Sequence, residues 1–135
     1  MSESVFKEDI FEGKKVFITG GGTGMGLGFA QAFLTHGAEV FIASRKEEKL
    51  KEAAAETKKK FGKELIWKAM DVRDNDSVEE VTKFLDYEWG GLDILVNNAA
   101  GNFVAPVAAM SENAWRAVVD IVLDGTFRVS KACYP

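Results

Sequence analysis

A glycine-rich stretch between two regular patterns places the strongest constraint on how this chain can fold. Residues 16–19 read Val-Phe-Ile-Thr, an apolar and largely β-branched run that is typical of a short buried strand. Glycines crowd positions 20–28, and a helical pattern begins within them. In such a corner the N–H groups of the first helical turn and the helix dipole both favour an anion. We therefore expect a phosphate-bearing ligand here.

The spacing of the glycines distinguishes between types of phosphate-binding corner. A Walker loop needs a Lys after its last Gly, and this stretch has none. The Gly-x-Gly-x-x-Gly fingerprint fails in every register. The stretch fits Thr-Gly-x-x-x-Gly-x-Gly, at Thr19, Gly20, Gly24 and Gly26. The same glycine spacing recurs at Gly22, Gly26 and Gly28, but the end of the strand at Thr19 favours the first register. A flexible glycine hinge is the alternative, and the strand and helix flanks argue against it.

The rest of the chain alternates strand and helix patterns. Further strands are expected at 38–44, 65–70 and 92–96, and helices at about 27–36 and at 46–61. A third helix should be capped by Asp76 or Ser77 and end at Gly90–Gly91. A last helix, apolar nearly all round, should follow Ser111 as its N-cap. This pattern predicts one α/β domain, a Rossmann-like doubly wound parallel sheet of order 3-2-1-4 with helices on both faces. The ligand should bind beyond the carboxyl ends of strands 1 and 4.

Composition limits the classes of partner. The 135-residue chain has a net charge of −4, so no general attraction to nucleic acid or to an anionic membrane is expected. No apolar run reaches the roughly 18 residues of a membrane span. Residues 1–12 lack an apolar stretch and contain several acidic residues, so they resemble neither a signal nor a transit peptide. The single cysteine, Cys133, is expected to be a buried apolar side chain. We expect a soluble intracellular protein, of the cytoplasm or an organelle matrix. No metal site is expected, and the only histidine, His36, should be a helix cap or a solvated side chain.

Polar residues follow the other strands where their carboxyl ends should meet. Ser44-Arg45 stands after strand 2, where a site selective for NAD would carry a carboxylate. Arg45 offers a bidentate fork to a ribose 2′-phosphate, which favours NADP(H), although it could simply be a charge at the start of a helix. Asp71 could accept from an adenine amine or be a turn residue. Arg73 could pair with Asp74 or reach a phosphorylated substrate.

Together these residues resemble the short-chain dehydrogenase/reductase superfamily over residues 14–135. The carriers are the Thr19–Gly26 stretch, Asp71-Val72 and the run Asn97-Asn98-Ala99-Ala100-Gly101. That run has an extra Ala before its Gly. In this feature, and in residues 42–45, Arg73 and 111–115, the sequence is similar to the 2,4-dienoyl-CoA reductases. The resemblance implies NADP(H) binding by Gly20, Gly21, Gly22, Thr23, Gly24, Met25, Gly26, Ser44, Arg45, Asp71, Val72, Asn98 and Ala99. It implies an acyl-CoA substrate touched by Arg45, Arg73, Phe103 and Ser111.

Two departures qualify the resemblance. Val122 stands where the wider superfamily carries a catalytic Asn. The dienoyl-CoA reductases also lack that Asn, so this departure agrees with the narrower resemblance. The superfamily's Tyr-x-x-x-Lys is absent, so no catalytic residue is expected in this chain, whose only tyrosines are Tyr87 and Tyr134. Residues 1–135 thus resemble the N-terminal half of a reductase, an incomplete NADP-binding domain that is inactive alone. The expected whole is an NADPH-dependent reductase of unsaturated fatty acyl-CoA and a homo-oligomer, dimer or tetramer, joined through the apolar helix. A 3-oxoacyl reductase, or a non-catalytic nucleotide-binding fragment, is the alternative.

Overall fold

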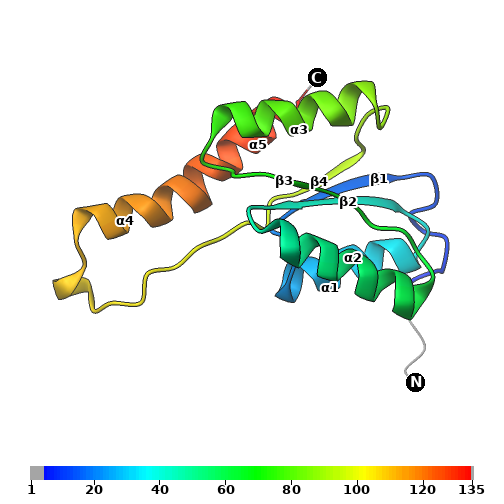
Figure 1. The fold of residues 1–135 in the computed structure, drawn as a ribbon, viewed down its shortest axis with the longest axis horizontal. Helices are drawn as coiled ribbons and strands as arrows, with labels where there is room; N and C mark the ends of the chain where they lie inside the picture. Colours follow the sequence, from blue (N-terminus) through cyan, green and yellow to red (C-terminus); the bar gives the residue numbers. More distant parts are fainter. Residues whose placement is uncertain (1–4, 135) are drawn as a thin grey trace.

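The computed structural model describes residues 5–134, in which strands and helices alternate around one sheet (Figure 1). The strands are β1 (Lys15–Thr19), β2 (Glu39–Ser44), β3 (Ile66–Ala69) and β4 (Ile94–Val96). The helices are α1 (Gly24–Thr35), α2 (Glu47–Phe61), α3 (Asn75–Tyr87), the short 3₁₀ turn η1 (Val107–Ala109), α4 (Glu112–Val119), the π-helical turn η2 (Asp120–Asp124) and α5 (Gly125–Cys133).

The sheet is parallel throughout and has the order β3-β2-β1-β4, as the sequence predicts. β1 is central and pairs with both β2 and β4; Val16, for example, lies opposite Val40 on one side and Ile94 on the other. The chain therefore crosses from one half of the sheet to the other between β3 and β4. A ligand at a doubly wound sheet binds beyond the strand ends beside such a crossover.

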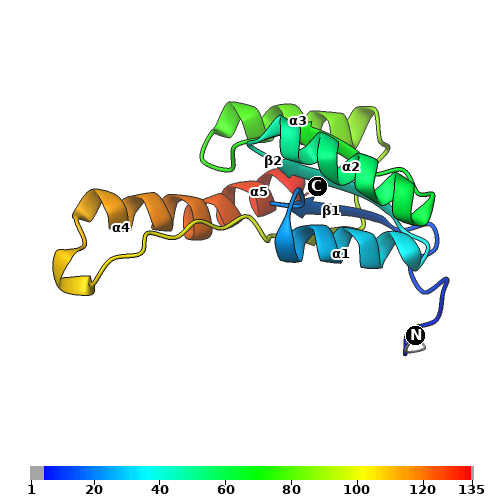
Figure 2. The same cartoon turned by 60° about the horizontal axis from the view of Figure 1, so that its bottom comes forward.

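Helices cover both faces of the sheet, α1 and α2 on one and α3 and α5 on the other (Figures 1 and 2). Side chains alternate accordingly along β1: Val16 and Ile18 join a core with residues of α1 and α2, whereas Phe17 joins a core with residues of α3 and α5. β2 repeats the pattern and is buried on both faces, as expected of an inner parallel strand. Both cores hold fully buried strand residues, so the sheet is a rigid base for the loops at its carboxyl edge.

The loop after β4 and helix α4 extend away from the sheet (Figures 1 and 2). The last helix does not run regularly from Glu112 but passes through the π turn η2 before α5. Gly125 follows that turn and packs so closely on Val72 that a Cβ there would lie 2.8 Å from Val72 Cγ2. Val129 of α5 is fully buried in the core on the α3 side of the sheet, whereas Trp115, Leu123 and Phe127 stay 59–66% exposed.

The boundaries of α3 differ from the prediction. Its N-cap is Asp74, whose carboxylate accepts from the backbone N–H groups of Asp76 and Ser77, so Asp76 or Ser77 as the cap is wrong. The helix ends at Tyr87, before the two glycines, which adopt φ values of +81° and +105° in the turn toward β4. Within residues 5–134 no helix is both long and apolar enough to cross a membrane.

Candidate functional site

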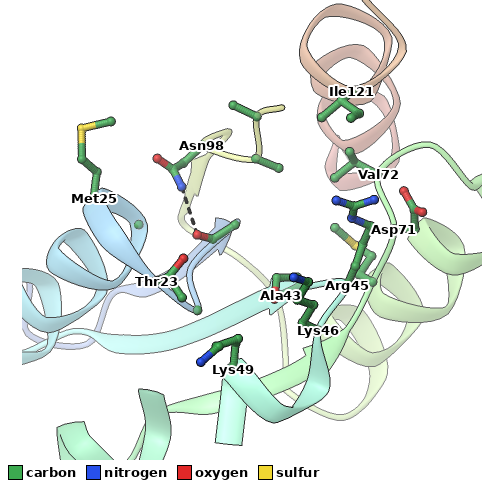
Figure 3. Close-up of a pocket in the computed structure, with 17 residues that line it drawn as sticks. Thr23, Met25, Ala43, Arg45, Lys46, Lys49, Asp71, Val72, Asn98 and Ile121 are labelled. Carbon is green, nitrogen blue, oxygen red and sulfur yellow. Dashed lines mark hydrogen bonds between the residues drawn. The ribbon is translucent and has the colours of Figure 1, made fainter. Parts of the chain in front are cut away.

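A cavity of about 470 Å³ opens at the carboxyl edge of the sheet, where the loops after all four strands meet (Figure 3). It is lined by Gly20, Gly22, Thr23, Met25, Gly26, Ala43, Ser44, Arg45, Lys46, Lys49, Met70, Asp71, Val72, Asn98, Ala99, Ala100 and Ile121. This is the edge at which the sequence places the ligand. Segments up to about 100 residues apart in the chain thus line one continuous site.

The glycine corner adopts the first of the two possible registers. Gly20 and Gly24 take left-handed φ values of +67° and +56°. A Cβ on Gly26 would lie 2.3 Å from the Gly20 carbonyl oxygen and 2.5 Å from Asn98 Nδ2, closer than any real Cβ contact. A Cβ on Gly28, by contrast, would meet nothing within 4 Å. The turn therefore needs glycine at 20, 24 and 26 but not at 28.

Thr19 joins the glycine corner to the loop after β4. Its buried hydroxyl oxygen accepts from the backbone N–H groups of Asn98 and Ala99, at 3.0 and 2.9 Å. In return, Asn98 Nδ2 donates to the Thr19 and Gly20 carbonyl oxygens at 3.1 and 3.2 Å, the latter contact dashed in Figure 3. The Asn98 side chain is therefore fixed between the two loops, and it lines the cavity as part of that junction.

The cavity is electropositive on the side of α1 and β2. α1 begins at Gly24 after Thr23, which makes no capping hydrogen bond with its side chain, and the first turn holds no acidic residue. The N–H groups of that turn are therefore available to an anion. Arg45, Lys46 and Lys49 bring cationic side chains to the rim of the cavity (Figure 3). Asp71 is the one carboxylate among the residues that line the cavity in the described chain.

Asp71 lines the cavity close to Arg45 and forms a tight pair with Arg73 (Figure 3). Arg73 Nη2 lies 2.6 Å from Asp71 Oδ2, and Arg73 Nε donates to both carboxylate oxygens at 3.0 and 3.2 Å. The guanidinium hydrogen bonds lower the pKa of Asp71, which burial alone would raise. Asp71 is therefore a carboxylate at neutral pH, able to accept from a ligand amine. The local partner of Arg73 is Asp71, not the predicted Asp74, whose carboxylate already caps α3.

A second cavity of about 500 Å³ lies beside the π turn. Its lining is Arg73, Asn113, Arg116, Ala117, Val119, Asp120 and Asp124. Arg73 thus faces the second cavity while its partner Asp71 faces the first. The other residues predicted to touch substrate lie elsewhere: Ser111 accepts from the Ala114 N–H as the cap of α4, and Phe103 is 58% exposed on the loop after β4.

The predicted cofactor residues line the first cavity except Gly21 and Gly24. Gly21 packs on β2, since a Cβ there would lie 2.5 Å from Ile42 Cγ2, and Gly24 serves the turn through its backbone. The predicted set lacks six residues that also line this cavity: Ala43, Lys46, Lys49, Met70, Ala100 and Ile121. Lys49 could have been found, because it stands one helical turn after Arg45. Ile121 gave no local indication, because the π turn sets its direction.

Two other predictions concern residues outside the cavities. His36 is the C-cap of α1, with Nδ1 2.7 Å from the Ala32 carbonyl oxygen, as expected. Burial raises the pKa of the half-buried Cys133 thiol to about 11, so it is protonated and a poor nucleophile at neutral pH. In residues 5–134 no three His, Cys, Asp or Glu side chains gather as metal ligands would.

Comparison with known proteins identifies relatives of the whole described chain. The family model of the short chain dehydrogenases matches residues 14–135. A peroxisomal 2,4-dienoyl-CoA reductase of Rattus norvegicus, which produces (3E)-enoyl-CoA, is 42% identical over 130 residues, 96% of this chain and 44% of the relative. The chain therefore spans less than half the length of that curated relative.

Solved structures give the same result. A short chain dehydrogenase of Bacillus anthracis superposes with a TM-score of 0.81 at 45% identity, covering 88% of this chain and 47% of that one. An actinorhodin polyketide ketoreductase, solved with NADPH, superposes with a TM-score of 0.84 at 31% identity, covering 89% and 46%.

Proposed function

The chain belongs to the short-chain dehydrogenase family of oxidoreductases, which use a nicotinamide cofactor, and on that premise we propose that the complete protein is an NADPH-dependent reductase of 2,4-dienoyl-CoA thioesters. In fatty acid β-oxidation it would perform the auxiliary step that removes a conjugated diene. The substrate class rests on the 42% identity with the rat dienoyl-CoA reductase. The choice of NADPH rests on the charges of the first cavity.

The cation cluster at the end of β2 is the observation that carries the cofactor assignment. Arg45, Lys46 and Lys49 line the cavity where an NAD site would hold a carboxylate. An Arg fork and two ammonium groups are the partners that a 2′-phosphate requires. The space left by Gly26 and the free N–H groups of α1 suit a pyrophosphate. The related ketoreductase that was solved with NADPH agrees with this choice.

When bound, the cofactor supplies the hydride; the residues of this chain bind and orient. The first turn of α1 would hold the pyrophosphate, Arg45 would hold the 2′-phosphate, and the Asp71 carboxylate would accept from the adenine amine. The Thr19–Asn98 junction holds the loop after β4 against the glycine corner, and that loop would line the cofactor site. Placing the reacting groups in this way is the larger share of what the protein contributes.

We propose that the second cavity holds the coenzyme A moiety. Arg73 and Arg116 both line it, next to the cofactor cavity, and guanidinium groups suit the phosphates of coenzyme A. An acyl-CoA seated there would bring its thioester toward the nicotinamide side of the first cavity. Phe103 and Ser111, exposed on the neighbouring loop and helix cap, could meet the ligand only if the loop after β4 moves.

The assignment is tested by giving the complete protein a 2,4-dienoyl-CoA with NADPH and following the NADPH absorbance. We expect oxidation with the dienoyl thioester and little with a 3-oxoacyl-CoA. Turnover of the 3-oxoacyl substrate alone would move the protein to the ketoreductases, to which it is also similar in structure. Residues 1–135 alone lack the family's Tyr-x-x-x-Lys and are proposed to be inactive; turnover by this fragment would contradict that.

A further inference from the structure

We propose that Arg128, in α5, is a positioning residue that fixes the adenine side of the first cavity by tying the loop after β3 to the π turn η2. Arg128 does not line the cavity itself, and it acts through Val72 and Asp120. The inference rests on the proposed function only for the identity of the ligand, a 2′-phosphorylated dinucleotide.

The tie consists of three contacts made by one nitrogen atom. Arg128 Nη1 donates to the Val72 carbonyl oxygen at 3.4 Å and to the Asp120 carbonyl oxygen at 3.3 Å. The same atom lies 2.7 Å from Asp120 Oδ1. The Arg128 side chain is only 24% exposed, so water screens this pair less than a surface ion pair. Val72 and Arg128 are 56 residues apart, so the tie joins separate elements of the fold.

One end of the tie, Val72, belongs to the wall of the first cavity, and the other end, Asp120, directly precedes a residue of that wall. Val72 lines the cavity directly, and so does Ile121, which follows Asp120 in the π turn; Figure 3 places the two side chains next to each other. Packing reinforces the hydrogen bonds here. A Cβ on Gly125 would lie 2.8 Å from Val72, and one on Gly101 would lie 2.8 Å from Ile121 Cδ1. The π turn therefore rests on the loops after β3 and after β4 at once.

The loop that is tied carries the group that should recognise adenine. Asp71 precedes Val72, and its N–H donates to Ser77 Oγ at 3.0 Å, which anchors the loop on the α3 side. Arg128 anchors the loop on the α5 side through the next residue. With both anchors the Asp71 carboxylate is held at a fixed height above the sheet. Displacements of about 1 Å in such a group can cost large factors in function, because hydrogen bonds to a ligand depend steeply on geometry.

Three variants of the complete protein test the role of Arg128. Arg128→Met keeps the apolar stem and removes every donor, and Arg128→Lys keeps a cation that can reach the same acceptors. Lys131→Met removes a cation from the exposed surface of the same helix and is the matched control. Calorimetry would measure the Kd of each for adenosine 2′,5′-bisphosphate and for reduced nicotinamide mononucleotide, which represent the two halves of the cofactor. Hydrogen exchange of the 71–74 amides without ligand would report on the loop itself.

We expect Arg128→Met to weaken the binding of the bisphosphate about fivefold to tenfold, because a displaced Asp71 carboxylate would lose its hydrogen bond from adenine. The affinity for the mononucleotide should stay unchanged. Arg128→Lys should restore most of the affinity, and Lys131→Met should match the wild type. Equal weakening of both halves, or none, would overturn the inference. If the wild type binds neither half, the proposed function fails; faster exchange of 71–74 in Arg128→Met would then still uphold the tie, and unchanged exchange would refute it.

Discussion

At the scale of single residues, we propose that Arg45 decides which dinucleotide the cavity accepts. Replacing Arg45 with Ala removes the fork expected to hold the 2′-phosphate, while the pyrophosphate contacts at α1 remain. We therefore expect the Kd for NADPH to rise about tenfold to a hundredfold, the range for lost hydrogen bonds to a charged group, and the Kd for NADH to stay the same. Fluorescence titration of the complete protein measures both.

The control for Arg45 is Lys51→Ala, which removes a cation of α2 that pairs with Glu47 at 2.8 Å and does not line the cavity. It should bind both nucleotides as the wild type does. An Arg45→Ala variant that loses NADPH and NADH equally would refute the role in 2′-phosphate recognition.

Two glycines that are two residues apart in α1 give opposite predictions for the effect of alanine on stability. Gly26→Ala forces a Cβ into the Gly20 carbonyl and the Asn98 amide, and should lower the free energy of unfolding by about 1–3 kcal/mol, the usual cost of overpacking. Gly28→Ala adds a Cβ in open space within α1 and should raise it by about 0.5–1 kcal/mol, because Ala loses less backbone entropy in a helix. Urea unfolding of the two variants compares them. A Gly26→Ala variant as stable as Gly28→Ala would contradict the close approach.

At the scale of elements, the cap of α3 can be identified by mutation. Asp74→Ala removes an acceptor for the N–H groups of Asp76 and Ser77 and should cost about 1 kcal/mol of stability. Asp76→Ala removes only a negative charge from the first turn and should cost about 0.3–0.5 kcal/mol, the smaller helix-dipole effect. Thermal unfolding ranks the two variants, and the reverse order would restore Asp76 as the cap.

Strand order and most helices could be predicted, because each depends on a pattern within a few residues. The alternation of Val16, Phe17 and Ile18 between two cores is visible in the sequence as an apolar run, and the glycine spacing defines the corner. The misassigned pair at Arg73 shows the limit of such reasoning. Asp74 is its neighbour in sequence, but that carboxylate is engaged at the start of α3, so the guanidinium binds Asp71. The backbone N–H groups at the start of α3 and the Arg73 guanidinium could both use the Asp74 carboxylate, and the backbone geometry gives it to the N–H groups.

The π turn and the tie at Arg128 could not be predicted for a related reason. Nothing near residue 128 in the sequence indicates a contact with Val72, which lies in a loop formed much earlier in the chain. The direction of Ile121 depends on the extra residue in one helical turn, and that turn lies where the helix rests on Gly101 and Val72. Features that depend on two packed elements escape a reading of either one alone.

At the scale of the whole molecule, the exposed apolar face of the last helix predicts self-association. Trp115, Leu123 and Phe127 are each more than half exposed, and large apolar surfaces of this kind mark interaction sites. We propose that the complete protein forms a homo-oligomer through this face. Leu123→Glu should shift its sedimentation toward smaller species. Tyr87→Glu, which puts the same charge at a still more exposed apolar site at the end of α3, should sediment as the wild type. An unchanged Leu123→Glu would refute the interface.

The junction between Thr19 and the loop after β4 has a consequence for the order of events during synthesis. The glycine corner is translated early. The two N–H groups that donate to the Thr19 hydroxyl belong to Asn98 and Ala99, which follow 79 and 80 residues later. At roughly 5–20 residues per second, a ribosome needs several seconds to cover that distance. A nascent chain therefore carries an unfinished nucleotide corner throughout this interval. We therefore expect nucleotide capture to follow the docking of β4 and not to guide the early steps of folding.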